Sequence, residues 1–449
     1  MGVKTRKLGN SQGLDVQWQA PLNADGSTVY NLKAGEGYFL NTTGGVIEVV
    51  LPASPTLGDT ISIVDYAGTF ATNDCIINTS NEKLGGLNRD ISLSTNDTRL
   101  TLVYADDTNG WTSFENEAKS DPTGDPYSPA YYAATGGTIT TSGDFKVHVF
   151  TGDGCFVVST AAKNLPTADG SVDYLVVAGG GGGGGNTEPG AGGGGGGGGG
   201  FRVSNALSLP GPTTSPLAAP TGFTFATGTY PVTVGGGGSG GGPQQAANTG
   251  SNSIVSTITS SGGGRGSSNG PGIPSPNQGA ARNVGAPGGS GGGGSHGESA
   301  GGTGNTPPVS PPQGNPGGTG GPSQPSFAGG GGGGAGAAGP DATTAASTGA
   351  VGSFVSPSLA VSCAGTSGPV SSTRYFSGGG GGASQPNPSG NRPGGSGGGG
   401  TGGVGNPAPG TAGSANTGGG GGGGGGNCNA TGGAGGKGIV ILRYKFQTS

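Results

Sequence analysis

Residues Val172–Gly200 read VDYLVVAGGGGGGGNTEPGAGGGGGGGGG, and this stretch decides what kind of fold the chain adopts. The apolar residues of a buried strand end at Ala178 and are followed at once by polyglycine. Glycine loses more backbone freedom on ordering than any other residue, so a long glycine run is expected to stay unfolded. The stretch is therefore either a flexible linker or part of a structure that only glycine can form.

Glycine is unevenly distributed along the chain. Of 114 glycines in 449 residues, only 20 lie in residues 1–170. The remainder is about one-third glycine, the proportion found in collagen. A continuous Gly-X-Y repeat is absent, however, because pure glycine runs are broken by Pro, Asn, Ser and Ala. A collagen triple helix is excluded.

Charged residues make up 9% of the chain, and the net charge is −5. Between residues 179 and 436 they are few and scattered, with no basic stripe, so no nucleic-acid partner is expected. The four cysteines (Cys75, Cys155, Cys363 and Cys428) are far apart and predict neither a disulfide framework nor a zinc site.

The N-terminus, MGVKTRKLGN, lacks the apolar segment of a signal peptide, and no apolar run reaches membrane-spanning length. We expect a soluble protein made in a reducing cytoplasm, with no membrane insertion. Residues 1–30, with a basic start and a lone Trp18, are expected to form either an extended attachment arm or an ordinary N-terminal strand.

Residues 31–118 predict a small β-sandwich or barrel. Short runs of β-branched and aromatic residues recur every 8–12 residues or so, separated by turn residues, and the last two flank an Asn109-Gly110 hairpin turn. The expected strands are Tyr38–Leu40, Val46–Leu51, Thr60–Asp65, Cys75–Asn78, Ile91–Leu93, Arg99–Ala105 and Trp111–Phe114.

A proline-containing stretch, 119–131, is expected to link this module to a second one covering 132–449. Apolar strands between 144 and 178 open the second module, and IVILRYKF, at 439–446, closes it. The first of these strands contains DFKVHVF, whose alternation predicts a half-buried strand with Lys146 and His148 facing outward. The continuous apolar runs DYLVVA and IVILRY predict central strands of one sheet, so the glycine insertion at 179–436 is anchored at both ends.

Glycine runs recur within the insertion, and loops rich in Pro, Ser, Asn and Thr separate them. Such runs can form left-handed helices with three residues per turn that pack side by side, because no Cβ keeps them apart. Ordering costs about 1–2 kcal/mol per residue and a hydrogen bond contributes about 0.5–1.5, so an isolated rod melts while a bundle persists. The expected rods are 179–185, 192–200, 235–238, 291–294, 329–334, 378–382, 397–400 and 418–426.

The alternative is a flexible low-complexity coil, which is the usual fate of Gly/Ser-rich sequence. The insertion lacks the charge that keeps disordered chains solvated, and we favour the rods. The predicted fold class is all-β, with an N-terminal β-sandwich or barrel followed by a β-sheet unit that holds a bundle of polyglycine II rods.

No enzyme is predicted. Matches to GxGxxG are uninformative in polyglycine, and TGGAGGKG lacks the Gly and Ser/Thr of a phosphate-binding loop. With only two histidines, His148 and His296, metal clusters and catalytic triads are not expected. We expect no catalytic residues, no cofactor and no metal.

The blocks GDFKVHVFTGDGCFVVS, VDYLVVAGGGGGGG, TYPVTVGGGG and GKGIVILRYK, in this order, resemble the glycine-rich domain of bacteriophage tail fibres and adhesins, as in cyanophages and other marine phages. The front module, GEGYFLNTTGGVIEVVLPASPTLGDTISIVDYAGTF, resembles a β-rich repeat of virion structural proteins. The resemblance implies a homotrimeric virion fibre whose N-terminal region attaches to phage particle proteins. It also implies contact between loops of the glycine-rich domain and a host surface glycan or outer-membrane protein.

By this resemblance, the contact loops are Leu207–Thr229, Arg265–Ala286, Pro307–Phe327 and Phe354–Phe376. The aromatic and cationic residues expected to bind the receptor are Phe223, Phe225, Phe327, Phe354, Arg374, Tyr375 and Phe376. These aromatics could equally plug the ends of the rod bundle. Two functions remain open, a receptor-binding tail fibre and a non-adhesive decoration of the capsid, neck or tail, and both place the protein in the virion.

Overall fold

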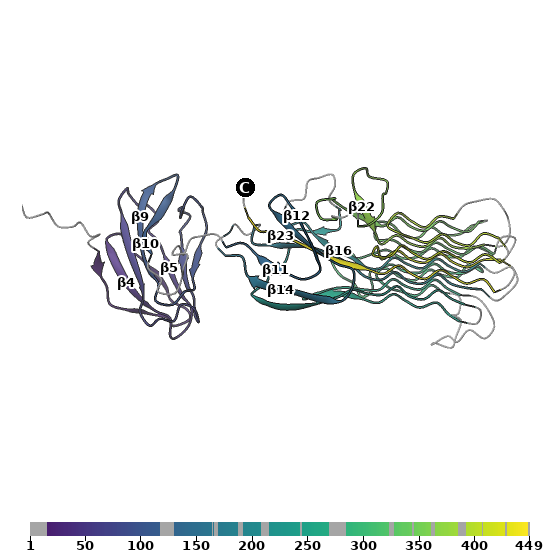
Figure 1. Cartoon of the computed structure of the whole chain (residues 1–449), viewed down its shortest axis with the longest axis horizontal. Helices are drawn as coiled ribbons and strands as arrows, with labels where there is room; N and C mark the ends of the chain where they lie inside the picture. Colours follow the sequence, from purple (N-terminus) through teal and green to yellow (C-terminus); the bar gives the residue numbers. More distant parts are fainter. Residues whose placement is uncertain are drawn as a thin grey trace, which may run out of the picture. The chain divides into compact units, whose positions relative to one another are not determined.

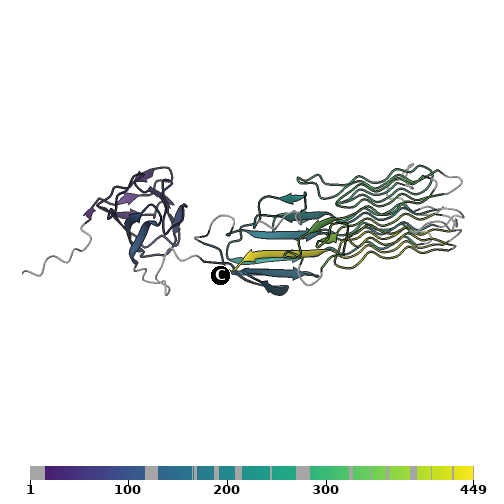
Figure 2. The ribbon, with the colours of Figure 1, turned by 90° about the horizontal axis from the view of Figure 1, so that it is seen from above.

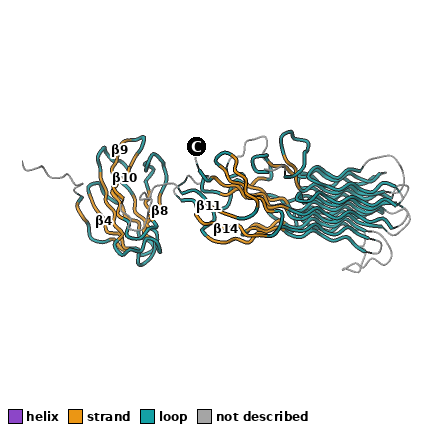
Figure 3. The backbone as a smooth tube through the Cα atoms, in the orientation of Figure 1, coloured by secondary structure: helices purple, strands orange, loops and turns teal. Residues whose placement is uncertain are grey.

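The computed structural model describes residues 16–116, 130–163, 165, 169–186, 192–207, 215–242, 245–268, 284–322, 327–343, 345–360, 364–384, 392–405, 407–426 and 429–447. Every regular element in these ranges is a β-strand, as the sequence predicts (Figure 3). The chain folds into two compact units that divide near Ala130, and each is described by itself.

The first unit contains two sheets (Figure 1). One sheet holds β1 (Gln17–Trp18), β2 (Leu22–Asn23), β4 (Glu36–Asn41), β6 (Thr60–Asp65), β9 (Arg99–Asp106) and β10 (Gly110–Asn116). The other holds β3 (Val29–Asn31), β5 (Ile47–Val50), β7 (Cys75–Asn78) and β8 (Ile91–Leu93). From β3 to β7 the chain alternates between the sheets, so strands that are neighbours within each sheet run parallel.

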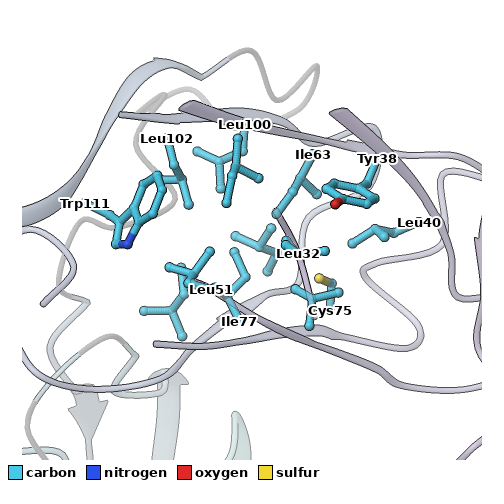
Figure 4. Packing of buried hydrophobic residues seen from close by; sticks show 14 of the residues in the cluster. Leu32, Tyr38, Leu40, Leu51, Ile63, Cys75, Ile77, Leu100, Leu102 and Trp111 are labelled. Carbon is cyan, nitrogen blue, oxygen red and sulfur yellow. The ribbon is translucent and has the colours of Figure 1, made fainter. Parts of the chain in front are cut away.

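One hydrophobic core lies between these two sheets (Figure 4). Leu40, Ile63 and Leu102 come from one sheet and Ile77 from the other, and all are buried. Trp111, at the start of β10, is fully buried and packs edge-on against Tyr104 at 5.7 Å. The unit is therefore a β-sandwich rather than a barrel.

All seven strands expected in this module are present, and β6, β7 and β8 have the expected bounds. The hairpin of β9 and β10 turns at Gly110, whose φ of 68° suits glycine. Strands β1–β3 lie within residues 17–31. This agrees with the alternative in which residues 1–30 form an ordinary N-terminal strand. Residues 1–15 and 117–129, which include 119–129 of the expected linker, lie outside the described residues.

The second unit contains two larger sheets and a hairpin (Figure 2). The six-stranded sheet has the order β12 (Thr138–Ser142), β13 (Phe145–Phe150), β23 (Ile439–Lys445), β15 (Val172–Val177), β16 (Phe201–Ser204) and β17 (Ala218–Ala219). The five-stranded sheet has the order β11 (Ala133–Thr135), β14 (Gly154–Thr160), β18 (Gly228–Thr233), β19 (Ser253–Val255) and β20 (Ile258–Ser260). The hairpin pairs β21 (Ser353–Val355) with β22 (Arg374–Phe376).

Strands β15 and β23 lie side by side at the centre of the six-stranded sheet and pair antiparallel. Both faces of this sheet are covered: Tyr174 and Leu442 pack towards the five-stranded sheet, while Leu175 and Ile441 pack towards β21 and β22. This double burial explains the continuous apolar sequence of the two strands. The prediction that strands flanking the glycine insertion belong to one sheet is confirmed.

The expected outward position of His148 on β13 is wrong. Its side chain is fully buried in the six-stranded sheet, with Nδ1 2.7 Å from the Gly136 carbonyl and Nε2 3.1 Å from the Tyr444 hydroxyl. Because a carbonyl only accepts, Nδ1 carries the proton and Nε2 accepts from Tyr444. Burial lowers the pKa of His148, so the ring is held neutral. The alternation of β13 failed as a guide because both faces of the sheet are covered at this strand: Val147 packs with β21 and β22, and His148 packs against Phe156.

A buried ion pair links β15 and β23. Arg443 lies 3.5 Å from Asp173, and both side chains are almost inaccessible to solvent. Asp173 also accepts hydrogen bonds from the Ser204 hydroxyl at 2.7 Å and from the Ala206 amide at 2.8 Å, while Arg443 stacks over the Phe145 ring. The carboxylate is thus satisfied by a cation and by neutral donors, as a buried charge requires.

Candidate functional site

Backbone hydrogen bonds of the glycine run 179–186 repeat every three residues. The amides of Gly180 and Gly183 donate to the carbonyls of Gly436 and Gly433, both at 2.9 Å. A three-residue period is the signature of the left-handed helix with three residues per turn, in which every N–H and C=O points outward to a neighbour. We call each such segment a rod and the whole array the lattice.

The rod 179–186 has six neighbours. Its amides donate to three rods that run antiparallel to it, 192–200, 248–251 and 430–436. Its carbonyls accept from three that run parallel, 235–241, 262–268 and 418–426. Six neighbours around one rod is hexagonal packing. A single glycine run cannot stay ordered by itself. In the lattice, the entropic cost of ordering a rod is offset by its hydrogen bonds to neighbouring rods.

The spacing between rods leaves no room for side chains. A Cβ added at Gly196 would lie 2.1 Å from the Gly181 carbonyl oxygen, and one at Gly181 would lie 2.1 Å from the Gly264 oxygen. Atoms never approach so closely, so only glycine fits at these positions. Gly236, on the outside of its rod, is different, because a Cβ there would meet nothing within 4 Å.

Rods at the surface of the lattice carry side chains at every third position. In TGGAGGKG, residues 431–438, Thr431 and Ala434 are exposed while the glycines between them face neighbouring rods. The outermost rod 408–414 keeps only Gly410 and Gly413, whose amides donate to Thr431 and Ala434. A side of a rod that faces a neighbouring rod requires glycine. The number of glycines per turn therefore indicates how many sides of the rod are in contact with neighbours.

All eight expected glycine runs belong to the lattice, although Gly397 and Gly398 have positive φ and lie in a turn. Further rods occupy stretches between the glycine runs that were expected to be loops. These include 246–252, 299–305, 315–321, 338–342, 346–352 and 408–414. Their signal is a glycine or small residue at every third position, which a search for pure glycine runs does not detect.

The lattice has two ends. Rod 179–186 leaves β15 and rod 192–200 returns to β16, so residues 186 and 192 lie at the end away from the sheets, which we call the free end (Figure 2). The other is the sheet end. The described parts of two expected contact loops, Leu207–Thr229 and Phe354–Phe376, lie at the sheet end, while residues 208–214 and 361–363 lie outside the described residues.

The other two expected contact loops reach the free end. Arg265–Ala286 does so by following rod 262–268, although its residues 269–283 lie outside the described residues. Pro307–Phe327 begins at the sheet end and reaches the free end along rod 315–321, with 323–326 outside the described residues.

Phe223 and Phe225 close the core between the two sheets. Phe225 is 2% exposed, and its ring lies 5.3 Å from those of Phe156 and Phe223. Phe223 is half-buried and lies 5.3 Å from Tyr174. Both residues therefore pack in the core between the sheets and do not plug the ends of the rod bundle.

Four more of the expected receptor-binding residues belong to the hairpin β21–β22. Tyr375 and Phe376 are buried, and Phe376 packs against the six-stranded sheet. The Arg374 guanidinium donates from Nε to the Ala364 carbonyl at 2.8 Å. Phe354 is half-buried, with its ring 5.4 Å from Tyr375.

Phe327 differs from the other six because it lies at the free end. Its ring is half-buried and packs edge-on against His296 at 5.3 Å. His296 belongs to a tight turn in which Gly297 and Glu298 both donate to the Gly321 carbonyl, and Glu298 has a φ of 55°. This pair is the aromatic cluster that the described residues present at the end of the rods.

Within the described parts of the chain, no three His, Cys, Asp or Glu side chains are close enough to hold a metal ion. The same residues form no helix of the length and apolarity needed to cross a membrane.

Residues 157–445 match the family of glycine-rich domains. This region begins in β14, includes every rod described above and ends in β23, so the chain belongs to this family. None of the curated proteins compared with the chain matches it.

Proposed function

We propose that this chain is a virion protein of a bacteriophage, a tail fibre that attaches the particle to the surface of its host cell. In this proposal the chain assembles as a homotrimer, its N-terminal region binds other particle proteins, and loops of the glycine-rich domain bind a host glycan or an outer-membrane protein. The resemblance of its sequence blocks to phage fibre domains motivates the proposal.

The observation that supports it best is the lattice itself. Its rods are held mainly by hydrogen bonds between backbone groups, so the loops between rods are free to differ in sequence without weakening the scaffold. At the free end the rods that carry these loops lie side by side. A rigid scaffold with adaptable loops is the arrangement used by many binding proteins.

Attachment is tested with labelled full-length protein and cells of the bacterium on which the phage grows. We expect saturable binding that is lost in phage-resistant mutants of that bacterium. We also expect loss when residues 270–282 are replaced by an equal length of Gly and Ser. A matched variant at the sheet end, A415S/N416G, controls for folding and should bind as wild type.

Absence of binding by the folded oligomer would refute attachment. It would favour the alternative, a non-adhesive decoration of the capsid, neck or tail, for which copy number in the particle should follow the symmetry of that structure.

A further inference from the structure

A cavity of ≈ 350 Å³ lies beside the hairpin β21–β22 at the sheet end of the lattice. Segments that are far apart in sequence line it, and three of the four loops singled out in the sequence contribute to it. The residues used below are Pro216, Leu217, Pro312, Asn315, Phe354 and Tyr375. Its volume is within the range of small-molecule sites, about 300–1,000 Å³.

One wall of the cavity is an aromatic platform with a fixed orientation. Phe354 and Tyr375 are cross-strand partners in the hairpin, and their rings lie 5.4 Å apart at an angle of 42°. Tyr375 is buried and its hydroxyl accepts a hydrogen bond from the Val370 amide at 3.2 Å. The half-buried ring of Phe354 therefore rests on an immobile neighbour and keeps part of its surface towards the cavity.

Asn315, which also lines the cavity, offers an oriented hydrogen-bond acceptor. The Asn315 Nδ2 donates to the carbonyls of Gly334 and Ala335, both at 3.0 Å. These two bonds fix the amide plane and direct Oδ1 away from both carbonyls, where it remains able to accept. Proline rings of Pro216 and Pro312 complete a wall of C–H groups. Every described residue that lines the cavity is uncharged.

From this combination we infer that the cavity is a binding site for a neutral pyranose ring of a glycan. One face of a pyranose is a patch of C–H groups that packs on an aromatic ring, here Phe354. Its hydroxyls are donors, and one of them bonds to Asn315 Oδ1. Anionic sugars and phosphates are disfavoured because none of the described lining residues is a cation that could balance their charge.

The identity of the glycan as a host-surface component rests on the proposed function, but pyranose binding does not. Pyranose binding is measured on the purified full-length chain by saturation-transfer-difference NMR. The probes are methyl glycosides of glucose, galactose, mannose, N-acetylglucosamine and rhamnose, with sialic acid as the anionic comparison. We expect transfer to the C–H protons of at least one neutral glycoside at millimolar concentration and none to sialic acid.

Variants locate the site. Phe354→Ala should abolish the transfer, while Phe354→Tyr, which keeps the ring face, should retain it. Leu217→Trp fills the cavity with Phe354 in place and should also abolish it, which guards against a folding defect of the alanine variant. Tyr66→Ala removes an exposed aromatic side chain of the first unit and should leave the signal unchanged.

Transfer that persists in both Phe354→Ala and Leu217→Trp would overturn the inference. So would a preference for sialic acid, or no transfer from any neutral glycoside. If pyranose binding is found but the protein does not bind cells, the cavity is confirmed and the attachment proposal fails. Cell binding that is unchanged in the Leu217→Trp variant would place attachment at other loops.

Discussion

Replacing Gly196 with alanine should destabilise the second unit, whereas the same change at Gly236 should not. At Gly196 the new Cβ would lie 2.1 Å from the Gly181 carbonyl oxygen, while ordinary contacts begin at 3.4 Å. The two rods must separate by about 1.3 Å to relieve this clash. At Gly236 a Cβ meets nothing within 4 Å.

The magnitude follows from the hydrogen bonds between these rods. Separation breaks those from Gly181 to Gly197 at 2.9 Å, from Gly184 to Gly194 at 2.9 Å and from Ala178 to Gly200 at 3.0 Å. At about 1 kcal/mol each, with some repacking strain, the loss is roughly 3–5 kcal/mol. Alanine also lowers the conformational entropy of the unfolded chain, which stabilises the folded state by about 0.4–1 kcal/mol in both variants. The net effect is a loss of about 3 kcal/mol at Gly196 and a small gain at Gly236.

Pulse proteolysis across a urea gradient measures this difference for the second unit. We expect the midpoint of the Gly196→Ala variant to fall by roughly 1 M or more, and that of Gly236→Ala to stay level or rise. Tryptophan fluorescence serves as an internal control, because both tryptophans, Trp18 and Trp111, belong to the first unit and should report no change. Equal midpoints for the two variants would refute the close packing of the rods.

Three further predictions concern the sheets. Burial lowers the pKa of His148 from 6.5, so the unfolded chain binds a proton at a higher pH than the folded chain does. The urea midpoint of the second unit should therefore decrease as the pH is lowered below about 6.5. The decrease should be smaller in His148→Gln. Asp173→Asn leaves a buried arginine uncompensated and should cost about 3–5 kcal/mol in urea unfolding, whereas Asp169→Asn, at a partly exposed pair, should cost less than about 1. Burial raises the pKa of the Cys75 thiol, so iodoacetamide should label exposed Cys155 but not Cys75 in the folded protein, as peptide mapping would show.

Much of the fold could be predicted from the sequence, because short strands separated by turns and continuous apolar runs are local patterns. The neighbouring positions of β15 and β23 followed from their shared apolar character, although about 260 residues separate them. The position of His148 could not be predicted, because its burial depends on a second sheet that covers the first.

The rods at the surface of the lattice were missed for a related reason. A segment such as 408–414 has few glycines, and its conformation is imposed by neighbours that the sequence does not place beside it. The three-residue spacing of Gly410 and Gly413 is the signal that remains. Likewise, the cavity beside Phe354 assembles residues from separate loops, and nothing in the spacing of Leu217 or Asn315 brings them together in advance.

Hydrogen exchange of the wild-type chain shows whether the polyglycine segments form an ordered lattice. Peptides from residues 179–200 and 418–438 are followed by mass spectrometry from seconds to days. We expect protection comparable to that of β15 and β23, because the amides of central rods are bonded to neighbouring carbonyls. Complete exchange of the glycine runs within seconds, while the strands stay protected, would mean that the insertion is a flexible linker.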